Sequence, residues 1–266
     1  MLLLVRLLRS LISMIPKIIW QTYKDPVDTL PNYALDALNS WKDMNPDYEH
    51  RYMDDAEAGK FVLEEYGQEW YDIFINCPVG VMRGDLWRYL VVYKYGGIYT
   101  DLDTICNHPV EFWLKEEYDM IVCPENNVHF CQWTFAAVAG HPILKSVLDF
   151  IKIGFENPDY TKPHFVHELT GPYAWTSGIL SALEINDKLA LVYGNGVDIC
   201  NSSDKAKEYK FYCFGGEEWR MFHFMGSKHI YGSQEWNDGK YVQWIKEPLT
   251  QAYRAGEILD EELEIK

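Results

Sequence analysis

The sequence predicts a single α/β domain in which a mixed, mainly parallel sheet is flanked by helices in a Rossmann-like arrangement. Short apolar, β-rich runs alternate with segments of helical periodicity from residue 15 to beyond the midpoint. The chain has 266 residues, 48% of them hydrophobic, which suits one large domain with ample core. Neither internal repeats nor low-complexity tracts interrupt this pattern. We therefore expect one layered domain over residues 15–246.

The first predicted unit is a strand, a helix and a second strand. Residues 15–22 form an apolar, β-rich run that ends in a polar segment, so we expect a buried first strand. Apolar side chains at helical spacing predict a helix over residues 33–44, and residues 48–55 predict the next strand. Open α/β sheets bind ligands at the carboxyl ends of their strands, so the residues that follow these strands are candidates for a site.

The alternation continues along the chain. We expect a helix over about residues 55–76, a helix stopped by a Gly-Gly pair over 81–97, and one strand over 98–106. The later predicted elements are strands at 119–125 and 131–140, helices at 141–155 and within 167–184, and strands at 189–194, 208–214 and 221–226.

The two ends of the chain differ from the predicted domain. Residues 1–14 are apolar but contain Arg6 and Arg9, and they are too short to span a bilayer, which takes about 20 residues. We interpret them as an extension, a weak signal sequence or an interfacial helix that makes peripheral membrane contact. Residues 247–266 are charged and helical in pattern. We expect a cytoplasmic or membrane-peripheral protein, or a Golgi or secretory one if the first segment acts as a signal.

Charge and cysteine usage exclude some classes of protein. The formal net charge of −16 argues against a nucleic acid as partner, because phosphate backbones are bound by clusters of Lys and Arg. The six cysteines show no C-x2-C pair and no dense spacing, which argues against a zinc knuckle or a small disulfide scaffold. We expect reduced and mostly buried thiols.

A pair of acidic residues is the first candidate for chemistry. Asp101 and Asp103 come at the end of a predicted buried strand, where side chains two residues apart lie on the same side. Hard carboxylate oxygens at this spacing suit Mg2+ or Mn2+. An acidic pair at a strand end is also the common pattern of a solvated turn, so the pair alone does not decide the matter.

A second pair strengthens the metal interpretation. Asp85 and Arg88 lie three residues apart on the preceding helix and share one face. An arginine binds phosphate through two parallel hydrogen bonds, and an adjacent aspartate can hold sugar hydroxyls. An ordinary surface ion pair is the alternative. The Gly96-Gly97 stop leads directly into the D-x-D strand, which favours a common site at one sheet edge.

These motifs resemble a known family. The run from Arg83 to Asp103 contains R-G-D-L-W-R-Y and then Y-G-G-I-Y-T-D-L-D, which resembles the Och1-like glycosyltransferases with a D-x-D sugar-binding motif, the family called GT32. It is also similar to the glucosylating domains of large clostridial toxins. Residues 15–22 and 40–55 resemble the opening segments of the same family. The resemblance covers about ninety contiguous residues, from 15 to 106.

The resemblance implies a GT-A fold and transfer of a sugar, with retention, from a UDP-sugar or GDP-mannose to a glycan, glycolipid or protein. Asp101 would contact the donor ribose or the metal, and Asp103 would ligate the metal, which is Mn2+ or Mg2+. Asp85 and Arg88 would bind the donor sugar and its phosphates. A front-face mechanism and a double displacement both remain open.

Other residues are weaker candidates. Those assigned to the donor are Trp20, Gln21, Thr22, Tyr23, Asp54, Gly97, Tyr99, Ser233 and Trp236. Those assigned to the acceptor are Asn126, Asn127, Gly171 and Pro172, although a Gly-Pro turn also begins many helices. Relatives close the metal site with a carboxy-terminal His, for which we favour His223 over His229 because it ends a strand-like run.

Two other functions keep part of this pattern. An inactive nucleotide-sugar- or glycan-binding module would share the fold but would tolerate loss of the D-x-D and its arginine, all of which are present. A metal-dependent phosphohydrolase would use acidic strand ends, but such enzymes usually need further acidic or His clusters. The sequence therefore favours a glycosyltransferase.

Overall fold

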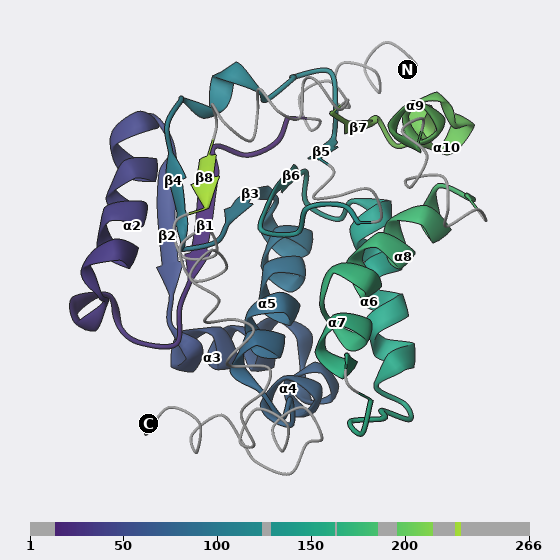
Figure 1. Ribbon diagram of the computed structural model, residues 1–266, viewed down its shortest axis with the longest axis horizontal. Coiled ribbons are helices and arrows are strands. Elements are labelled where there is room, and N and C mark those ends of the chain that lie inside the picture. Colours follow the sequence, from purple (N-terminus) through teal and green to yellow (C-terminus); the bar gives the residue numbers. More distant parts are fainter. Residues whose placement is uncertain (1–13, 124–128, 163, 186–195, 215–226, 230–266) are drawn as a thin grey trace, which may run out of the picture.

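The computed structural model describes residues 14–123, 129–162, 164–185, 196–214 and 227–229. Its centre is a six-stranded sheet in the order β2-β1-β3-β6-β5-β7 (Figure 1). The strands are β1 (Ile18–Thr22), β2 (Glu49–Met53), β3 (Gly97–Thr100), β5 (Met120–Val122), β6 (Thr134–Ala137) and β7 (Phe211–Cys213). Neighbouring strands are parallel except that β6 runs antiparallel to β3 and β5. The predicted mixed, mainly parallel sheet is confirmed.

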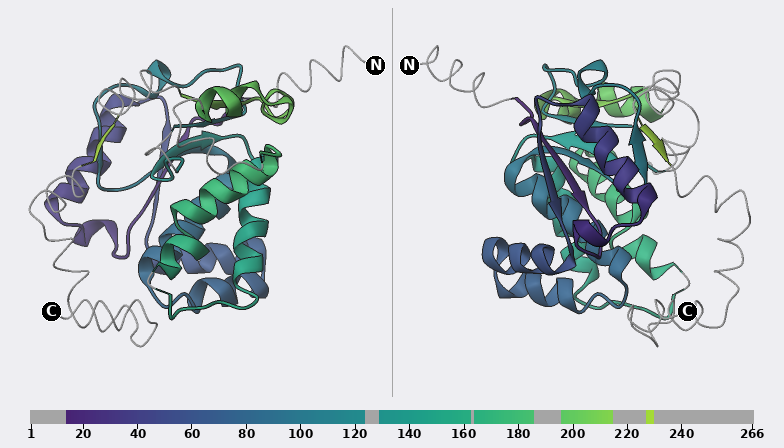
Figure 2. Two further views of the ribbon diagram at one scale, coloured as in Figure 1. Left: turned by 45° about the vertical axis from the view of Figure 1, so that its right-hand side comes forward. Right: turned by 90° about the vertical axis from the view of Figure 1, so that its left-hand side faces the viewer.

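Helices cover both faces of this sheet (Figure 2). The longer ones are α2 (Asn32–Met44), α3 (Asp55–Tyr66), α4 (Gln68–Ile75), α5 (Gly80–Tyr95), α6 (Pro142–Gly154) and α8 (Pro172–Ala182). Short ones are α7 (Phe165–Leu169), α9 (Gly196–Ser202), α10 (Asp204–Glu208) and the 3-10 turns η1 (Val27–Thr29) and η2 (Val110–Phe112). A separate pair of strands, β4 (Thr104–Cys106) and β8 (Ser227–His229), is antiparallel.

The alternation of side chains along each strand divides the core into two layers. The layer that α5, α6 and α8 cover includes Trp20, Tyr99, Met120 and Phe135. The layer that contains Trp41 of α2 includes Ile19, Ile98, Ile121 and Ala136. Neighbouring residues of one strand thus point into opposite layers, as the period of two requires, and both faces of the sheet are buried.

Two predicted boundaries were wrong. The helix expected over residues 55–76 is two helices. Gly67, with φ 79°, ends α3, and α4 begins at the next residue, Gln68. The strand expected over 98–106 ends at Thr100, and the chain turns before β4. The strands expected at 189–194 and 221–226, and the segments 1–13 and 247–266, lie outside the described residues.

The cysteine prediction is confirmed, because all six cysteines lie in the described segments, are buried and form no disulfide. Within the described segments we find no helix with the length and apolar character that a bilayer crossing demands.

The contact between α6 and α8 depends on a residue without a side chain. A Cβ atom added at Gly178 would lie 2.5 Å from the Val147 Cα atom, which is backbone and cannot turn away. The Ser146 hydroxyl donates a hydrogen bond of 2.9 Å to the Gly178 carbonyl oxygen, in keeping with this close approach. The two helices can therefore pack at this distance only with glycine at position 178.

We expect Gly178→Ala to lower the free energy of unfolding by about 2 kcal/mol or more, because the helices must separate or distort. Gly84→Ala is the matched control: it also replaces a helical glycine, but a Cβ there meets nothing within 4 Å. The control should be neutral or stabilising by up to about 1 kcal/mol. Chemical denaturation measures both, and equal stability of the two variants would contradict the packing argument.

Candidate active site

A sharp turn delivers the candidate residues to one place. Helix α5 ends at Gly96, which has φ 70° and whose N–H donates to the Val92 carbonyl oxygen. Gly97 follows with φ 109°, and a Cβ there would lie 2.6 Å from the Ile18 carbonyl oxygen. Only glycine allows the chain to pass so close to β1 and enter β3. The end of β3 then lies beside the middle of α5.

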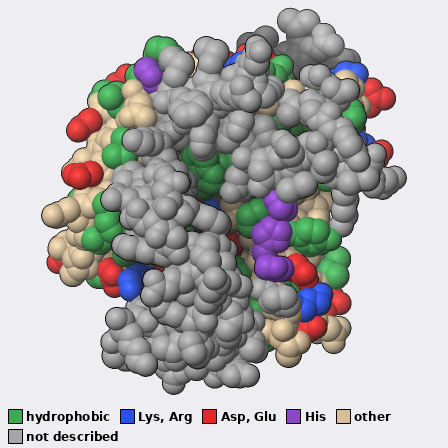
Figure 3. Space-filling model, in the orientation of Figure 1, with side chains coloured by type: hydrophobic (Ala, Val, Ile, Leu, Met, Phe, Trp, Pro, Cys, Tyr) green, Lys and Arg blue, Asp and Glu red, His purple; other side chains and the backbone are tan. Residues whose placement is uncertain are grey.

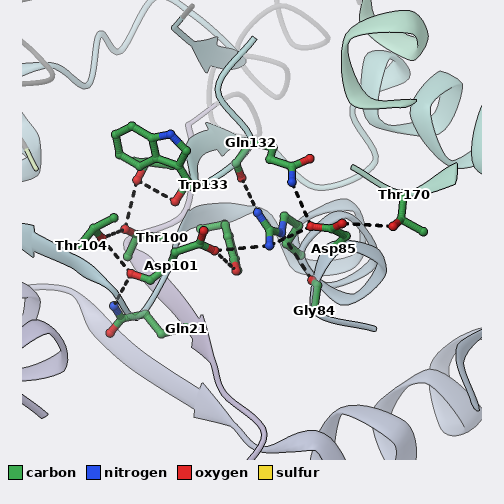
Figure 4. A network of polar contacts seen from close by, with 12 residues as sticks. Gln21, Gly84, Asp85, Thr100, Asp101, Thr104, Gln132, Trp133 and Thr170 are labelled. Atoms are coloured by element: carbon green, nitrogen blue, oxygen red, sulfur yellow. Dashed lines mark hydrogen bonds and ion pairs between the residues drawn. The ribbon is translucent and has the colours of Figure 1, made fainter. Parts of the chain in front are cut away.

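A buried arginine joins the helix to the strand end (Figure 4). The Arg88 Nη2 atom lies 3.0 Å from Asp85 Oδ1 and 3.4 Å from Asp101 Oδ1. The guanidinium carbon lies 4.8 Å from the centre of the Tyr99 ring, and the Tyr99 hydroxyl donates a hydrogen bond of 2.5 Å to Asp101 Oδ1. The prediction that these groups come together is therefore correct, and the pair of Asp85 and Arg88 is buried and not an exposed ion pair.

Two polar residues from later in the chain hold the Asp85 carboxylate. The Gln132 side-chain amide donates to Oδ1 at 2.9 Å, and the Thr170 hydroxyl donates to Oδ2 at 3.0 Å. The Tyr89 hydroxyl lies 2.6 Å from Gln132 Oε1 and 3.0 Å from the Thr170 carbonyl oxygen. Arg88 Nη1 also donates to the Gln132 carbonyl oxygen at 3.2 Å. The carboxylate is thus fixed from three sides.

The network shifts the ionisation of its members. Burial raises the pKa of Asp85 to about 7, although Arg88 and the Thr170 hydroxyl favour the charged form. Burial acts to lower the pKa of Arg88, but the nearby Asp101 carboxylate and the Tyr99 and Asp85 groups keep it well above its usual value. Burial also raises the pKa of Tyr99 well above its usual range. Arg88 is therefore a permanent buried cation.

The D-x-D motif is a turn and not the end of an extended strand. The Thr104 N–H donates to the Asp101 carbonyl oxygen at 3.3 Å, and the Thr104 hydroxyl donates to the same oxygen at 2.8 Å. Leu102 between the two aspartates is buried beside Leu30, Ala34 and Leu38 of the α2 region. Burial of this one apolar side chain anchors the turn and directs the flanking carboxylates away from it.

The two aspartates suit a hard divalent cation. The Asp101 side chain is 25% exposed, and its contacts with Tyr99 and Arg88 both use Oδ1. Asp103 is partly exposed in the same turn. The Asp103 Oδ1 atom is itself buried, and carboxylate oxygens are the donors that Mg2+ and Mn2+ prefer. The donor chemistry therefore fits the metal that the resemblance implies.

Of the two candidates for the third metal ligand, the structure describes only the backbone of His229. Residue His223 lies outside the described residues. The backbone of His229 is described in β8, where it pairs with Thr104, the residue after the D-x-D turn. The choice of His223 over His229 stays a prediction.

Comparison with known proteins now adds to the geometry. Residues 31–120 match the family described as glycosyltransferase sugar-binding region containing DXD motif. This segment contains Asp85, Arg88 and both aspartates of the turn. The family resemblance inferred from the motifs is therefore confirmed.

Curated relatives of the chain are named as mannosyltransferases. The chain is 32% identical over 196 residues to "Initiation-specific alpha-1,6-mannosyltransferase" of Schizosaccharomyces pombe, an alignment that covers 64% of this chain and 49% of the relative. It is 38% identical over 141 residues to "Inositol phosphoceramide mannosyltransferase 3" of the same organism, covering 50% of this chain and 36% of the relative. The chain thus spans about half, or less, of these proteins.

A solved structure supports the fold. The "PaToxG Glycosyltransferase" matches with a TM-score of 0.50 at 18% identity, and the alignment covers 77% of this chain and 83% of that one. The single α/β domain of the GT-A type is confirmed at the level of fold.

The first two donor candidates, Trp20 and Gln21, are residues of β1. Trp20 is fully buried, its indole N–H donates to the Gly96 carbonyl oxygen at 2.8 Å, and it supports the turn from below. Gln21 is also buried, lies 2.8 Å from His50 Nε2, and its amide reaches the Asp101 carbonyl oxygen at 3.5 Å. Both residues support the site from within the core, and their predicted contact with the donor stays a prediction.

The next two donor candidates reach further out. The Thr22 hydroxyl donates to the Met53 carbonyl oxygen at 2.7 Å, and the hydroxyl of the partly exposed Tyr23 lies 3.1 Å from that of Tyr33. Asp54 accepts from the Glu57 N–H in a capping box that begins α3. A structural role is therefore visible for Asp54, and its contact with the base or ribose is untested.

The acceptor candidates are only partly described. Gly171 precedes Pro172, which is the first residue of α8, as expected for a turn that begins a helix. Asn126, Asn127, Ser233 and Trp236 lie outside the described residues. Sequence reasoning missed Gln132 and Thr170, which carry no periodic signal and belong to no motif that we identified.

The buried hydroxyl of Thr170 gives a test of the network. Because burial raises the pKa of Asp85 to about 7, the folded protein binds more protons than the unfolded chain between about pH 4 and pH 7, and stability falls as pH rises through that window. The Thr170 hydroxyl opposes this fall by stabilising the ionised form. We expect Thr170→Val to cost about 1–2 kcal/mol at pH 8.5 and less at pH 5, where the carboxyl is protonated.

Denaturation in metal-free buffer at both pH values measures this difference. Thr170→Ser, which keeps the hydroxyl, is the matched control, and at pH 8.5 its free energy of unfolding should be close to that of wild type. An equal cost of Thr170→Val at both pH values would contradict the described network.

Proposed function

We propose that the chain is a metal-dependent, retaining glycosyltransferase that moves a sugar from a nucleotide-diphosphate donor to a glycan, glycolipid or protein. The observation that carries the proposal is the contact of Arg88 with both Asp85 and Asp101, which joins helix α5 to the D-x-D turn inside the matched region. A buried cation beside carboxylates suits a ligand that has a phosphate group next to a sugar.

Different residues would bind different parts of the donor. Arg88 would face the diphosphate, because its guanidinium is permanently charged and offers several N–H donors. Asp85 would accept hydrogen bonds from the hydroxyls of the donor sugar, since Gln132 and Thr170 already fix its orientation. The negative field of Asp85 would also favour the positive charge that develops on the sugar ring in the transition state.

Asp101 and Asp103 would hold the metal. A bound Mn2+ or Mg2+ would supply positive charge for the leaving diphosphate. For the third ligand we keep His223, which the sequence favours, and the backbone pairing of His229 with Thr104 supports His229 as the alternative. The Tyr99 hydroxyl and Arg88 would keep the Asp101 carboxylate oriented, because both donate to its Oδ1 atom.

Mannose is the first sugar to test. The curated relatives are named as mannosyltransferases, so we propose a mannosyl donor and place GDP-mannose first in a panel that includes UDP-sugars. An inactive binding module of the same fold is the alternative. Hydrolysis of a donor in the absence of any acceptor distinguishes the two, because a binding module would leave the donor intact.

We expect Asp103→Asn and Arg88→Lys to reduce donor hydrolysis by about a hundredfold or more, because the first removes a metal ligand and the second removes the planar contact of the guanidinium with the leaving phosphates. Asp103→Asn should change the free energy of unfolding by about 0.5 kcal/mol or less, since the residue lies partly exposed in a turn. Arg88→Lys retains the charge but cannot reproduce the planar contact to two carboxylates.

Matched controls separate the site from the general effect of such substitutions. Asp36→Asn changes an exposed aspartate of α2, and Arg51→Lys changes an arginine that pairs with Glu49 at the surface. Both controls should hydrolyse the donor like wild type. Folded Asp103→Asn and Arg88→Lys proteins with near wild-type rates would show that this site does not perform the reaction.

We also expect a nucleoside diphosphate to bind weakly without metal, because its charges face two carboxylates in a chain of net charge −16. Calorimetry with GDP and UDP, with and without Mn2+, measures the effect. Mn2+ should tighten binding of the preferred nucleotide at least about tenfold, and Asp103→Asn should remove that gain. Equal affinities with and without the ion would contradict the metal assignment.

A further inference from the structure

Two segments run from the Asp85 carboxylate towards the surface. Residues 129–132 end at Gln132 and residues 167–170 end at Thr170, and both terminal side chains donate to Asp85. At the other end of the same segments, the rings of His129 and His167 meet edge to face, with centroids 4.7 Å apart and an interplanar angle of 85°. The histidine pair is thus linked to Asp85 through both segments.

The pair is not part of the core. His129 and His167 are both partly exposed, whereas Gln132 and Thr170 are buried. The space-filling view shows one group of histidine side chains on this face of the molecule, and a further histidine apart from it (Figure 3). Tyr173 of α8 adds a further ring, whose centroid lies 6.2 Å from that of His167. The surface next to the Asp85 network is therefore aromatic and carries ring nitrogens.

We propose that His129 and His167 bind the acceptor, and that this acceptor presents a neutral, hydroxyl-rich saccharide to the donor sugar at Asp85. The inference rests on the proposed glycosyltransferase function and adds the acceptor side of the same site. Imidazole nitrogens donate and accept hydrogen bonds, and sugar rings present both hydroxyls and C–H faces that pack on aromatic side chains. The two segments that lead from the histidines to Asp85 would place an acceptor hydroxyl beside the donor sugar.

The charges around the pair favour a neutral acceptor over an anionic one. Burial lowers the pKa of His129 to about 4 and also lowers that of His167, so both rings are uncharged at neutral pH. Lys162 precedes His167 by five residues in the chain, but its ammonium is paired with the Glu168 carboxylate at 2.9 Å. A phosphate bound here would meet neutral rings and the Asp85 carboxylate. A saccharide hydroxyl loses less hydration free energy than a phosphate does when it leaves water.

The experiment compares two readouts in the same variants. Donor hydrolysis without acceptor reports the donor site, and transfer to α-linked mannobiose reports the acceptor site. We expect His129→Ala and His167→Ala each to raise the KM for mannobiose about tenfold, the loss typical of one or two hydrogen bonds. Donor hydrolysis, the KM for the donor and the melting temperature should stay near wild type.

Matched variants keep the test sharp. His108→Ala removes another partly exposed histidine, one whose ring contacts Phe112 instead of the pair, and it should leave both readouts unchanged. If an alanine variant loses melting temperature, His129→Gln and His167→Gln replace it. These retain a polar side chain but lose the ring, and they should still weaken mannobiose use.

The outcomes are separable. A wild-type protein that hydrolyses no nucleotide sugar overturns the proposed function itself. Intact hydrolysis with an unchanged KM for mannobiose in both variants overturns the inference alone, as does a wild-type protein that neither binds nor glycosylates mannobiose. Inositol 1-phosphate, offered as an anionic acceptor, should be a poorer substrate, and a preference for it that depends on His129 and His167 would contradict the neutral class.

Discussion

The structure around the site depends on the burial of one charge. Arg88 is 6% exposed and cannot lose its proton, so the chain must surround its guanidinium with acceptors. It does so with the Asp85 and Asp101 carboxylates and the carbonyl oxygens of Gly84 and Gln132. These groups come from helix α5, the turn after β3 and the segment before β6. The guanidinium therefore fixes the mutual position of three elements, and removal of either carboxylate would leave the buried charge with only one carboxylate to compensate it.

The same requirement prepares the site for a charged ligand. A surface arginine would have to lose water and rotamer freedom to bind phosphate, whereas the Arg88 side chain is already ordered between Tyr99 and the two carboxylates. Asp85 shows the cost of this arrangement, because burial raises its pKa to about 7 even beside a permanent cation. Hydrogen bonds from Gln132 and Thr170 offset part of that cost. Stability and function are therefore coupled in one network.

Sequence reasoning identified the parts of this arrangement that local patterns encode. Strand β1, helices α2 and α5, and the pairing of Asp85 with Arg88 follow from periodicity, spacing and the Gly96-Gly97 stop. The prediction of a strand through the D-x-D motif was wrong, because long-range contacts decide where the strand stops. The Asp101 N–H donates to the Trp133 carbonyl oxygen, and the chain then turns at Leu102, which packs beside the α2 region. The β propensity of the surrounding residues does not reveal such a contact.

Gln132 and Thr170 were missed for a related physical reason. They meet Asp85 across 47 and 85 residues of sequence, a separation that no local pattern reveals. The match to the sugar-binding family ends at residue 120, before either of them. The matched region thus contains the arginine and the aspartates assigned to the donor, while the groups that hold Asp85 from the other side come from the part of the chain beyond it.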